Sequence, residues 1–129
     1  MLTKTLPHAT ERNSRAVNAA ITALLARFGN KVATSEAVRR QHAHTETWLV
    51  NQPPDAVVYA SSNEDVRAVV FICADHNIPI IPFGAGTSLE GHVNAPFGGI
   101  SLDLTEMNRI IAVHAEDLDC VVEPGVTRK

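Results

Sequence analysis

The apolar residues in the first part of the chain are spaced as in one amphipathic helix. Between residues 14 and 28 they recur three or four positions apart, at Val17, Ile21, Leu24, Leu25 and Phe28. Asn13 or Ser14 can cap the start of this helix, because their side chains accept a hydrogen bond from the first turn. Gly29 and Asn30 favour its end, because both residue types tolerate positive φ.

The following stretch alternates strand and helix patterns. Residues 34–42 favour a second short helix capped by Thr34 or Ser35, and an entry loop that ends in two prolines follows it. A strand is predicted at residues 56–59, then a helix that opens at residues 61–65 and closes at His76 and Asn77, then a strand at Ile80 and Ile81. A strand, helix and strand of this length predict two parallel strands with a right-handed crossover.

Short β-rich runs dominate the chain after Gly98. They lie at residues 100–104, 110–113 and 120–122 and are separated by polar or turn segments. We therefore predict an α+β fold, with a small parallel β-α-β subdomain followed by the first strands of a mixed or antiparallel sheet. We divide the chain into a helical segment with the entry loop, residues 1–53, and a second part, residues 54–129.

The composition is that of an ordinary globular protein. The 129 residues are 45% hydrophobic and 19% charged, with a formal net charge of −3. No basic run suggests a nucleic-acid groove, and no uninterrupted apolar stretch reaches the ~18 residues of a membrane helix. The chain starts without an apolar leader region, so we expect a cytoplasmic location. Cys73 and Cys120 lie in apolar runs, which predicts two buried free thiols.

A glycine-rich segment is the strongest candidate for ligand binding. Residues 82–91 read PFGAGTSLEG, in which two glycines let the backbone approach a ligand and two hydroxyl residues follow at once. Successive amides in such a loop can hold a phosphate. The loop is not a P-loop, because no Gly-Lys-Ser/Thr follows, and not a Rossmann loop, because Leu89 replaces the third glycine. Taken alone, this spacing is more often simply a turn.

Histidines and aromatic residues elsewhere are interpreted as structural. His42 and His44 form a His-X-His pair, but no third ligand is evident, so we expect a solvated or capping role and no metal site. Trp48 and Tyr59 are expected to pack against the core.

Four segments, in this order, resemble the flavoproteins of the p-cresol methylhydroxylase and vanillyl-alcohol oxidase type, in the D-lactate dehydrogenase (cytochrome) and glycolate oxidase branch. They are PDAVVYASSNEDVRAVV from residue 54, IPIIPFGAGTSLEGHV from residue 78, GGISLDLTEMNRI from residue 98 and VVEPGVTRK from residue 121. The resemblance covers residues 54–129, which would form the first part of a PCMH-type FAD-binding domain.

The resemblance implies FAD as the cofactor, with its pyrophosphate wrapped by the glycine-rich loop. The cofactor-binding residues so implied are Pro82, Phe83, Gly84, Ala85, Gly86, Thr87, Ser88, Gly91 and His92. The strand around Asp103 and the turn at residues 123–126 would lie near the cofactor with structural roles, Asp103 fixing a turn. Covalent attachment of the flavin to His92 is disfavoured, because His92 follows the motif in a setting unlike the Gly-Gly-His of relatives that do this.

The activity implied is oxidation of a 2-hydroxy acid, D-lactate or glycolate. A hydride would pass from C2 of the substrate to the flavin, and the electrons would go on to a cytochrome or quinone. No catalytic residue is assigned, because the rest of the FAD domain and the substrate domain are expected beyond Lys129, in an enzyme that could dock on a membrane.

Two alternatives remain open. One is a truncated, non-catalytic module that binds a nucleotide or a partner chain through unpaired strands between residues 100 and 122. The other is a different PCMH-type oxidase, such as an enzyme resembling alkylglycerone-phosphate synthase or a sugar-lactone oxidase, which would share the same loop.

Overall fold

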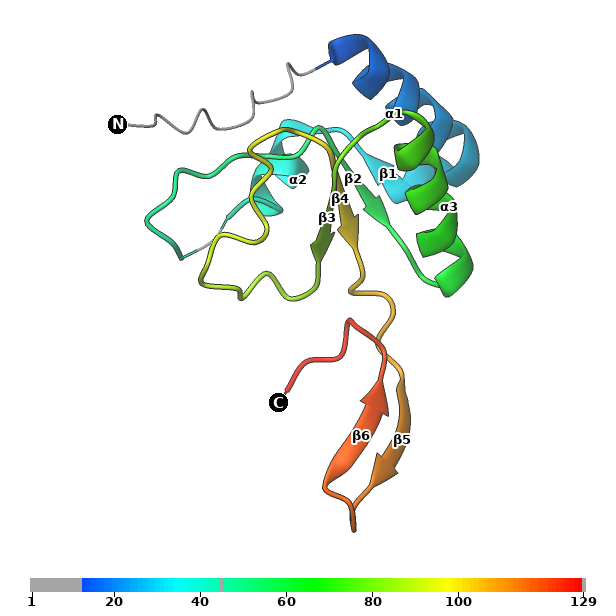
Figure 1. Cartoon of the computed structure of the whole chain (residues 1–129), viewed down its shortest axis with the longest axis vertical. Helices are drawn as coiled ribbons and strands as arrows, with labels where there is room; N and C mark the ends of the chain where they lie inside the picture. The colour runs from blue at the N-terminus through cyan, green and yellow to red at the C-terminus, as the bar shows by residue number, and fades with distance from the viewer. Residues whose placement is uncertain (1–12, 45, 129) are drawn as a thin grey trace, which may run out of the picture.

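The computed structural model describes residues 13–44 and 46–128, so the chain start discussed above lies outside the described residues. A four-stranded sheet forms its centre, with α1 and α3 together on one side, and a two-stranded hairpin extends away from this sheet (Figure 1). None of the described helices is both long and apolar enough to cross a membrane.

The helices lie where the sequence predicts them. Helix α1 spans Ser14–Phe28, and the side chain of Asn13 accepts a hydrogen bond of 3.2 Å from the Ala16 amide. A 3-10 turn, η1 (Gly29–Lys31), and the short helix α2 (Glu36–Gln41) follow. Helix α3 spans Asn63–Asp75; Ser62 caps it through the Asp65 amide at 3.1 Å, and Asn77 follows it with φ 54°.

The sheet has the order β1-β2-β4-β3. Strands β2 (Ala56–Tyr59) and β3 (Ile80–Phe83) both run parallel to β4 (Ile100–Asp103), which lies between them, while β1 (Val32–Ala33) pairs antiparallel with β2. The α+β class and the parallel β-α-β part are confirmed. Strand β4, however, completes this first sheet and does not begin a second one, because all four of its residues are buried and need a neighbour on both sides.

Alternation along β4 divides the buried residues between two faces of the sheet. Ile100 and Leu102 belong to the main hydrophobic core, which α1 and α3 share. The other principal members of this core are Leu24, Phe28, Ala56, Val58, Val69 and Cys73. Ser101 and Asp103 alternate to the opposite face, where Asp103 meets His42 just after α2.

The hairpin of β5 (Ile110–His114) and β6 (Asp119–Val122) is antiparallel and exposed. Every residue of β6 is exposed, including Cys120, so the prediction of two buried thiols is right for Cys73 and wrong for Cys120. The apolar pattern around Cys120 builds a strand, but this strand pairs only with β5 in its sheet and its side chains stay exposed among the described residues. Trp48 in the entry loop is 91% exposed, so its predicted packing role is also wrong.

The start of β4 is pinned to its neighbours through Gly99. The Gly99 amide donates to the Asp55 carboxylate at 2.7 Å, and the Asp55 amide donates to the Gly99 carbonyl at 2.8 Å. Gly99 has φ +109°, and a Cβ there would lie 2.4 Å from the Pro79 carbonyl oxygen. Only glycine therefore allows the strand to enter the sheet so close to the turn before β3.

The end of β4 carries a buried ion pair. His42 and Asp103 are each 3% exposed, and Nε2 of His42 lies 2.7 Å from Oδ2 of Asp103. Nδ1 of His42 lies 2.8 Å from the Val38 carbonyl oxygen, so both ring nitrogens face acceptors, which favours the imidazolium. Of the two predicted roles of His42, the solvated one is therefore wrong and the capping one is confirmed, since His42 is the C-cap residue of α2. Asp103 also accepts from the Thr105 amide at 2.8 Å, which fixes the turn after β4.

The pairing raises the pKa of His42 and lowers the pKa of Asp103. Desolvation by burial lowers the pKa of His42, but hydrogen bonds to Asp103 and Val38 and the charge of Asp103 outweigh it, so the pKa is raised above 6.5. Desolvation raises the pKa of Asp103, but hydrogen bonds from His42 and Thr105 and the charge of His42 leave it below 3.8.

Replacing Gly99 tests the close approach at the start of β4. Gly99→Ala places a methyl group against a backbone oxygen in a positive-φ conformation, so we expect a loss of about 3 kcal/mol in the free energy of unfolding. The control is Gly29→Ala, which also has positive φ but nothing within 4 Å, with an expected loss of about 1 kcal/mol. Denaturant unfolding of both variants provides the comparison, and equal losses would contradict the contact.

The stability that the ion pair supplies depends on pH. Because the pKa of His42 is raised, its contribution is complete below its unfolded value of 6.5 and is lost as pH rises through the folded pKa. Because the pKa of Asp103 is lowered, its contribution is present above 3.8 and is lost as pH falls through the folded pKa. Wild type should therefore exceed His42→Gln by about 2 kcal/mol between these two values, and by less on either side. Denaturant unfolding as a function of pH measures the difference, and a gap independent of pH would contradict the pairing.

Candidate functional site

The glycine-rich loop leaves the sheet at the end of β3. Pro82 and Phe83 pair with Leu102 and Asp103 in the sheet, so the loop begins at Gly84 and not at Pro82 as the sequence predicted. The proline is compatible with the strand because β3 is an edge strand, which does not need every amide for pairing. The loop is therefore anchored on the most regular part of the fold.

The side chain of Phe83 lies under the first turn of the loop. Its ring centroid is 4.4 Å from that of His42, with the two planes at 47°. A Cβ added to Gly86, which has φ +69°, would lie 2.8 Å from Cζ of Phe83. The loop thus turns directly over an aromatic ring, and a residue without a side chain is required at that point.

The backbone of the loop has unused hydrogen-bond donors. Within the described part of the chain, the amides of residues 84–92 donate to no protein acceptor, and the next amide that does so is that of Asn94, to the Gly91 carbonyl at 3.1 Å. These residues are half-buried or exposed, so the amides are accessible, and successive free amides around glycines can form an anion-binding concavity. These donors fit a diphosphate group without any basic side chain.

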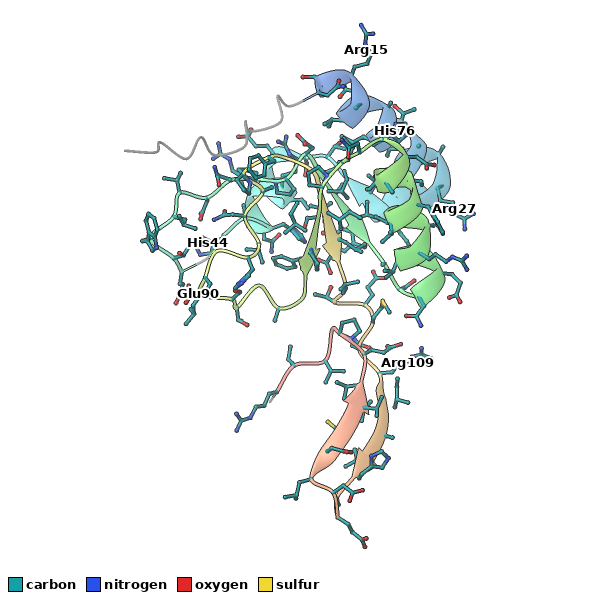
Figure 2. The ribbon with its side chains drawn as sticks, in the orientation of Figure 1. Arg15, Arg27, His44, His76, Glu90 and Arg109 are labelled. Atoms are coloured by element: carbon teal, nitrogen blue, oxygen red, sulfur yellow. The ribbon has the colours of Figure 1, made fainter. Side chains whose placement is uncertain are left out.

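A cavity of about 240 Å³ adjoins the loop. It is lined by residues 86–89 together with His44 and Glu46 of the entry loop. Figure 2 shows His44 and Glu90 on the same side of the molecule, where these two loops come together. Ser88 Oγ is hydrogen-bonded to Nδ1 of His92, so these two predicted site residues brace the far end of the loop.

The entry loop is held against the second half of the glycine-rich loop. The Gln52 amide donates to the side chain of Asn94 at 2.9 Å, and the Ala95 amide donates to the Gln52 carbonyl at 2.9 Å. A Cβ at Gly91 would lie 2.6 Å from a methyl carbon of Leu49. The predicted site residue Gly91 is thus a point of close contact between two loops.

The turn near the end of the chain lies beside the start of the loop. A Cβ at Gly84 would be 3.6 Å from the Pro124 carbonyl oxygen. Gly125 donates to the Met107 carbonyl at 2.7 Å, and Glu123 accepts from the Arg109 amide at 2.9 Å and from its guanidinium at 2.6 Å. The hydrogen bonds from Arg109 lower the pKa of Glu123. These contacts agree with a structural role for the turn.

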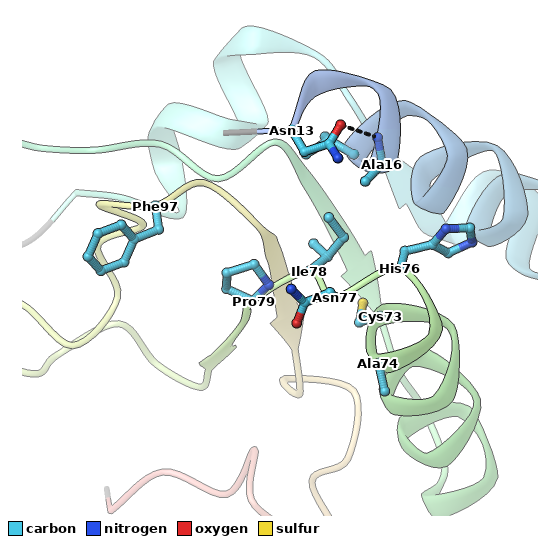
Figure 3. Close-up of a pocket in the computed structure, with 10 residues that line it drawn as sticks. Asn13, Ala16, Cys73, Ala74, His76, Asn77, Ile78, Pro79 and Phe97 are labelled. Carbon is cyan, nitrogen blue, oxygen red and sulfur yellow. Dashed lines mark hydrogen bonds between the residues drawn. The ribbon is translucent and has the colours of Figure 1, made fainter. Parts of the chain in front are cut away.

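A larger cavity of about 460 Å³ lies elsewhere, between the start of α1, the end of α3 and Phe97 (Figure 3). Asn13, His76 and Pro79 are among its lining residues, and none of the predicted site residues contributes to it. In the described ranges, no three His, Cys, Asp or Glu side chains come together as a metal site. The loop after β3 therefore has a run of free backbone donors and the predicted residues together, whereas none of the predicted residues lines the larger cavity.

One residue near the site was missed by sequence reasoning. His42 lies beneath Phe83, although its neighbourhood in the sequence reads as a polar loop. The available signal was Asp103, a charged residue in an apolar strand, which requires a buried partner of opposite charge.

Comparisons with known proteins agree on one family. The sequence model of a family described as "FAD binding domain" matches residues 54–129. A probable mitochondrial D-lactate dehydrogenase of Danio rerio is 48% identical over 98 residues, which are 76% of this chain and 20% of that protein. The mitochondrial D-lactate dehydrogenase (cytochrome) of Arabidopsis thaliana is 45% identical over 57% of this chain and 13% of that protein. The chain thus spans a fifth or less of the length of these relatives.

Solved structures give the same result for the fold. p-Cresol methylhydroxylase with substrate bound superimposes with a TM-score of 0.76 and 30% identity, covering 91% of this chain and 24% of that one. 4-Ethylphenol oxidase from Gulosibacter chungangensis superimposes with a TM-score of 0.77 and 29% identity, covering 95% of this chain and 24% of that one. Since the family match extends over more than half of the chain, this protein belongs to the FAD-binding domain family of PCMH-type flavoproteins, and its cofactor is FAD.

Proposed function

We propose that residues 84–92 hold the pyrophosphate of FAD, within the FAD-binding portion of a 2-hydroxyacid dehydrogenase that acts on D-lactate or glycolate. The observation that supports the binding role is the run of backbone amides without protein acceptors, at a loop that lines a cavity. The substrate class is supported by the names of the relatives, which include D-lactate dehydrogenases and a Bacillus subtilis glycolate oxidase subunit.

The residues of the loop divide the binding task. The amides of Gly84, Ala85 and Gly86 would donate to the phosphate oxygens, and the hydroxyls of Thr87 and Ser88 would add neutral donors. Each hydrogen bond to a charged group contributes roughly 1.5 to 3 kcal/mol, so four or five of them outweigh the weak repulsion of a surface with a net charge of −3. Local donors are therefore sufficient to attract a polyanion.

The remaining predicted residues would support this cradle. Pro82 and Phe83 anchor it to the sheet, and Gly91 lets the entry loop close against its second half. His92 would act through its hydrogen bond to Ser88, which orients that hydroxyl. In this proposal His92 is a non-covalent contributor to the FAD site.

Bound FAD would supply the oxidising chemistry for removal of a hydride from C2 of the hydroxy acid, and the electrons would pass on to a cytochrome or quinone. The contribution of the described residues is to bind and orient the cofactor, and no catalytic base is assigned among them. A cavity of about 240 Å³ is smaller than the roughly 300 to 1,000 Å³ of sites that enclose a whole ligand. The flavin and the substrate would therefore need further walls.

A second candidate function is a non-catalytic interaction module. The observation in its favour is the hairpin, in which Ile110, Ile111 and Val113 are each more than 60% exposed, with both outer edges unpaired in the described part of the chain. Such edges bind other strands readily.

A different PCMH-type oxidase is a third candidate. It is supported by relatives such as the 4-cresol dehydrogenase flavoprotein subunit of Pseudomonas putida, which is 42% identical to this chain over 76 residues.

Titration of the 129-residue chain with FAD tests the proposed function, with flavin fluorescence as the readout. Wild type should bind, and Gly86→Trp should raise the dissociation constant at least tenfold, because the side chain blocks one or two amide donors. Gly29→Trp is the matched control, since Gly29 also has positive φ but lies at the end of α1 with nothing within 4 Å.

Two results would count against the proposal. Equal weakening by both tryptophan variants would mean that the loop is not the binding element. Failure of a folded wild-type chain to bind, checked by circular dichroism, would mean that the loop by itself does not hold FAD.

A further inference from the structure

A continuous line of side-chain contacts connects the end of β4 to the glycine-rich loop. Asp103 is hydrogen-bonded to His42 at 2.7 Å, the ring of His42 lies 4.4 Å from that of Phe83, and Phe83 fills the space beneath Gly86. The two ends of this line are 17 residues apart in the sequence, but His42 comes from a segment about 60 residues before Asp103. Only the tertiary fold joins them.

The first part of the line is rigid. Asp103 uses Oδ2 for His42 and Oδ1 for the amide and hydroxyl of Thr105, at 2.8 and 2.6 Å. His42 uses both ring nitrogens, for Asp103 and for the Val38 carbonyl. Rotation of the imidazole would break two hydrogen bonds in a place without solvent, so its plane is fixed.

The second part of the line transmits this position to the loop. Phe83 is the last residue of β3, so its backbone is held by the sheet and its ring is confined by His42 on the inner side. At Gly86 a Cβ would meet Cζ and Cε2 of the ring at 2.8 and 3.0 Å. The loop backbone therefore packs against the outer edge of the ring. If the ring moved, the loop backbone could shift into the space that the ring leaves.

We propose that His42 is a positioning residue for the FAD loop. Held by Asp103 and the Val38 carbonyl, it supports Phe83, and Phe83 holds the turn at Gly86 in the conformation that leaves the amides free for the pyrophosphate. This inference rests on the proposed function of the loop. It assigns a binding consequence to a histidine whose two ring nitrogens are both used outside the loop, for Asp103 and the Val38 carbonyl.

The test compares His42→Gln with a control of similar stability cost. Glutamine can still donate to Asp103 but has no ring to support Phe83. The control, Val69→Ala, deletes the two γ-methyl groups of a fully buried side chain of α3 in the main core, on the face of the sheet away from His42. Both variants should lose stability, so a change confined to His42→Gln is not a general effect of destabilisation.

The primary readout needs no FAD. In the free protein, His42→Gln should move the backbone amide resonances of Gly84 and Gly86, whereas Val69→Ala should leave them unchanged. Phe83→Leu keeps the His42–Asp103 pair and should give the same loop changes. The double variant should add little to either single change, because both act on one line of contacts.

The dissociation constant for FAD is the second readout, and it should rise about tenfold in both His42→Gln and Phe83→Leu. Unchanged loop resonances in these two variants, or additive effects in the double variant, would overturn the positioning role even if wild type binds FAD. If the loop changes as expected but wild type does not bind FAD, the proposed function fails and the mechanical link stands. If His42→Gln does not fold, Phe83→Leu decides the question alone.

Discussion

Strand β4 is the constraint on which the rest of the structure depends. All four of its residues are buried and it is hydrogen-bonded to β2 on one side and β3 on the other. Because a strand in this position cannot move without breaking two ladders, its two ends become fixed points. At the first, Gly99 is locked to Asp55 and Pro79; at the second, Asp103 enters the opposite face of the sheet. The helices and loops are positioned relative to these points.

The charge at the end of β4 is paired beneath the glycine-rich loop. An unpaired carboxylate at Asp103 would be too costly in this position, so the fold brings the segment after α2 across the sheet to supply His42. That arrangement also places the His42 ring beneath Phe83, at the base of the glycine-rich loop. One buried ion pair thus compensates the charge of Asp103 and places the His42 ring against Phe83, beneath the loop with the free amides.

The hairpin and the glycine-rich loop are more exposed to solvent than the sheet around β4. Strand β6 is exposed along its whole length, and the cavity beside the loop is too small for a complete FAD. The chain also spans only 20% of the length of the Danio rerio relative. The loop proposed to hold the pyrophosphate is therefore anchored on the sheet at one end, while the hairpin presents apolar side chains and strand edges without neighbours among the described residues.

The sequence alone determined the local elements, because caps, periodicity and turn residues act over a few positions: α1 begins after Asn13, and β2 lies at residues 56–59. It also determined the family and the cofactor, because the ordered segments around the glycines are specific. Tertiary structure decided what depends on distant partners. It placed β4 in the middle of the sheet, exposed Cys120 and buried His42. Burial and pairing are set by neighbours remote in the chain, which local pattern does not encode.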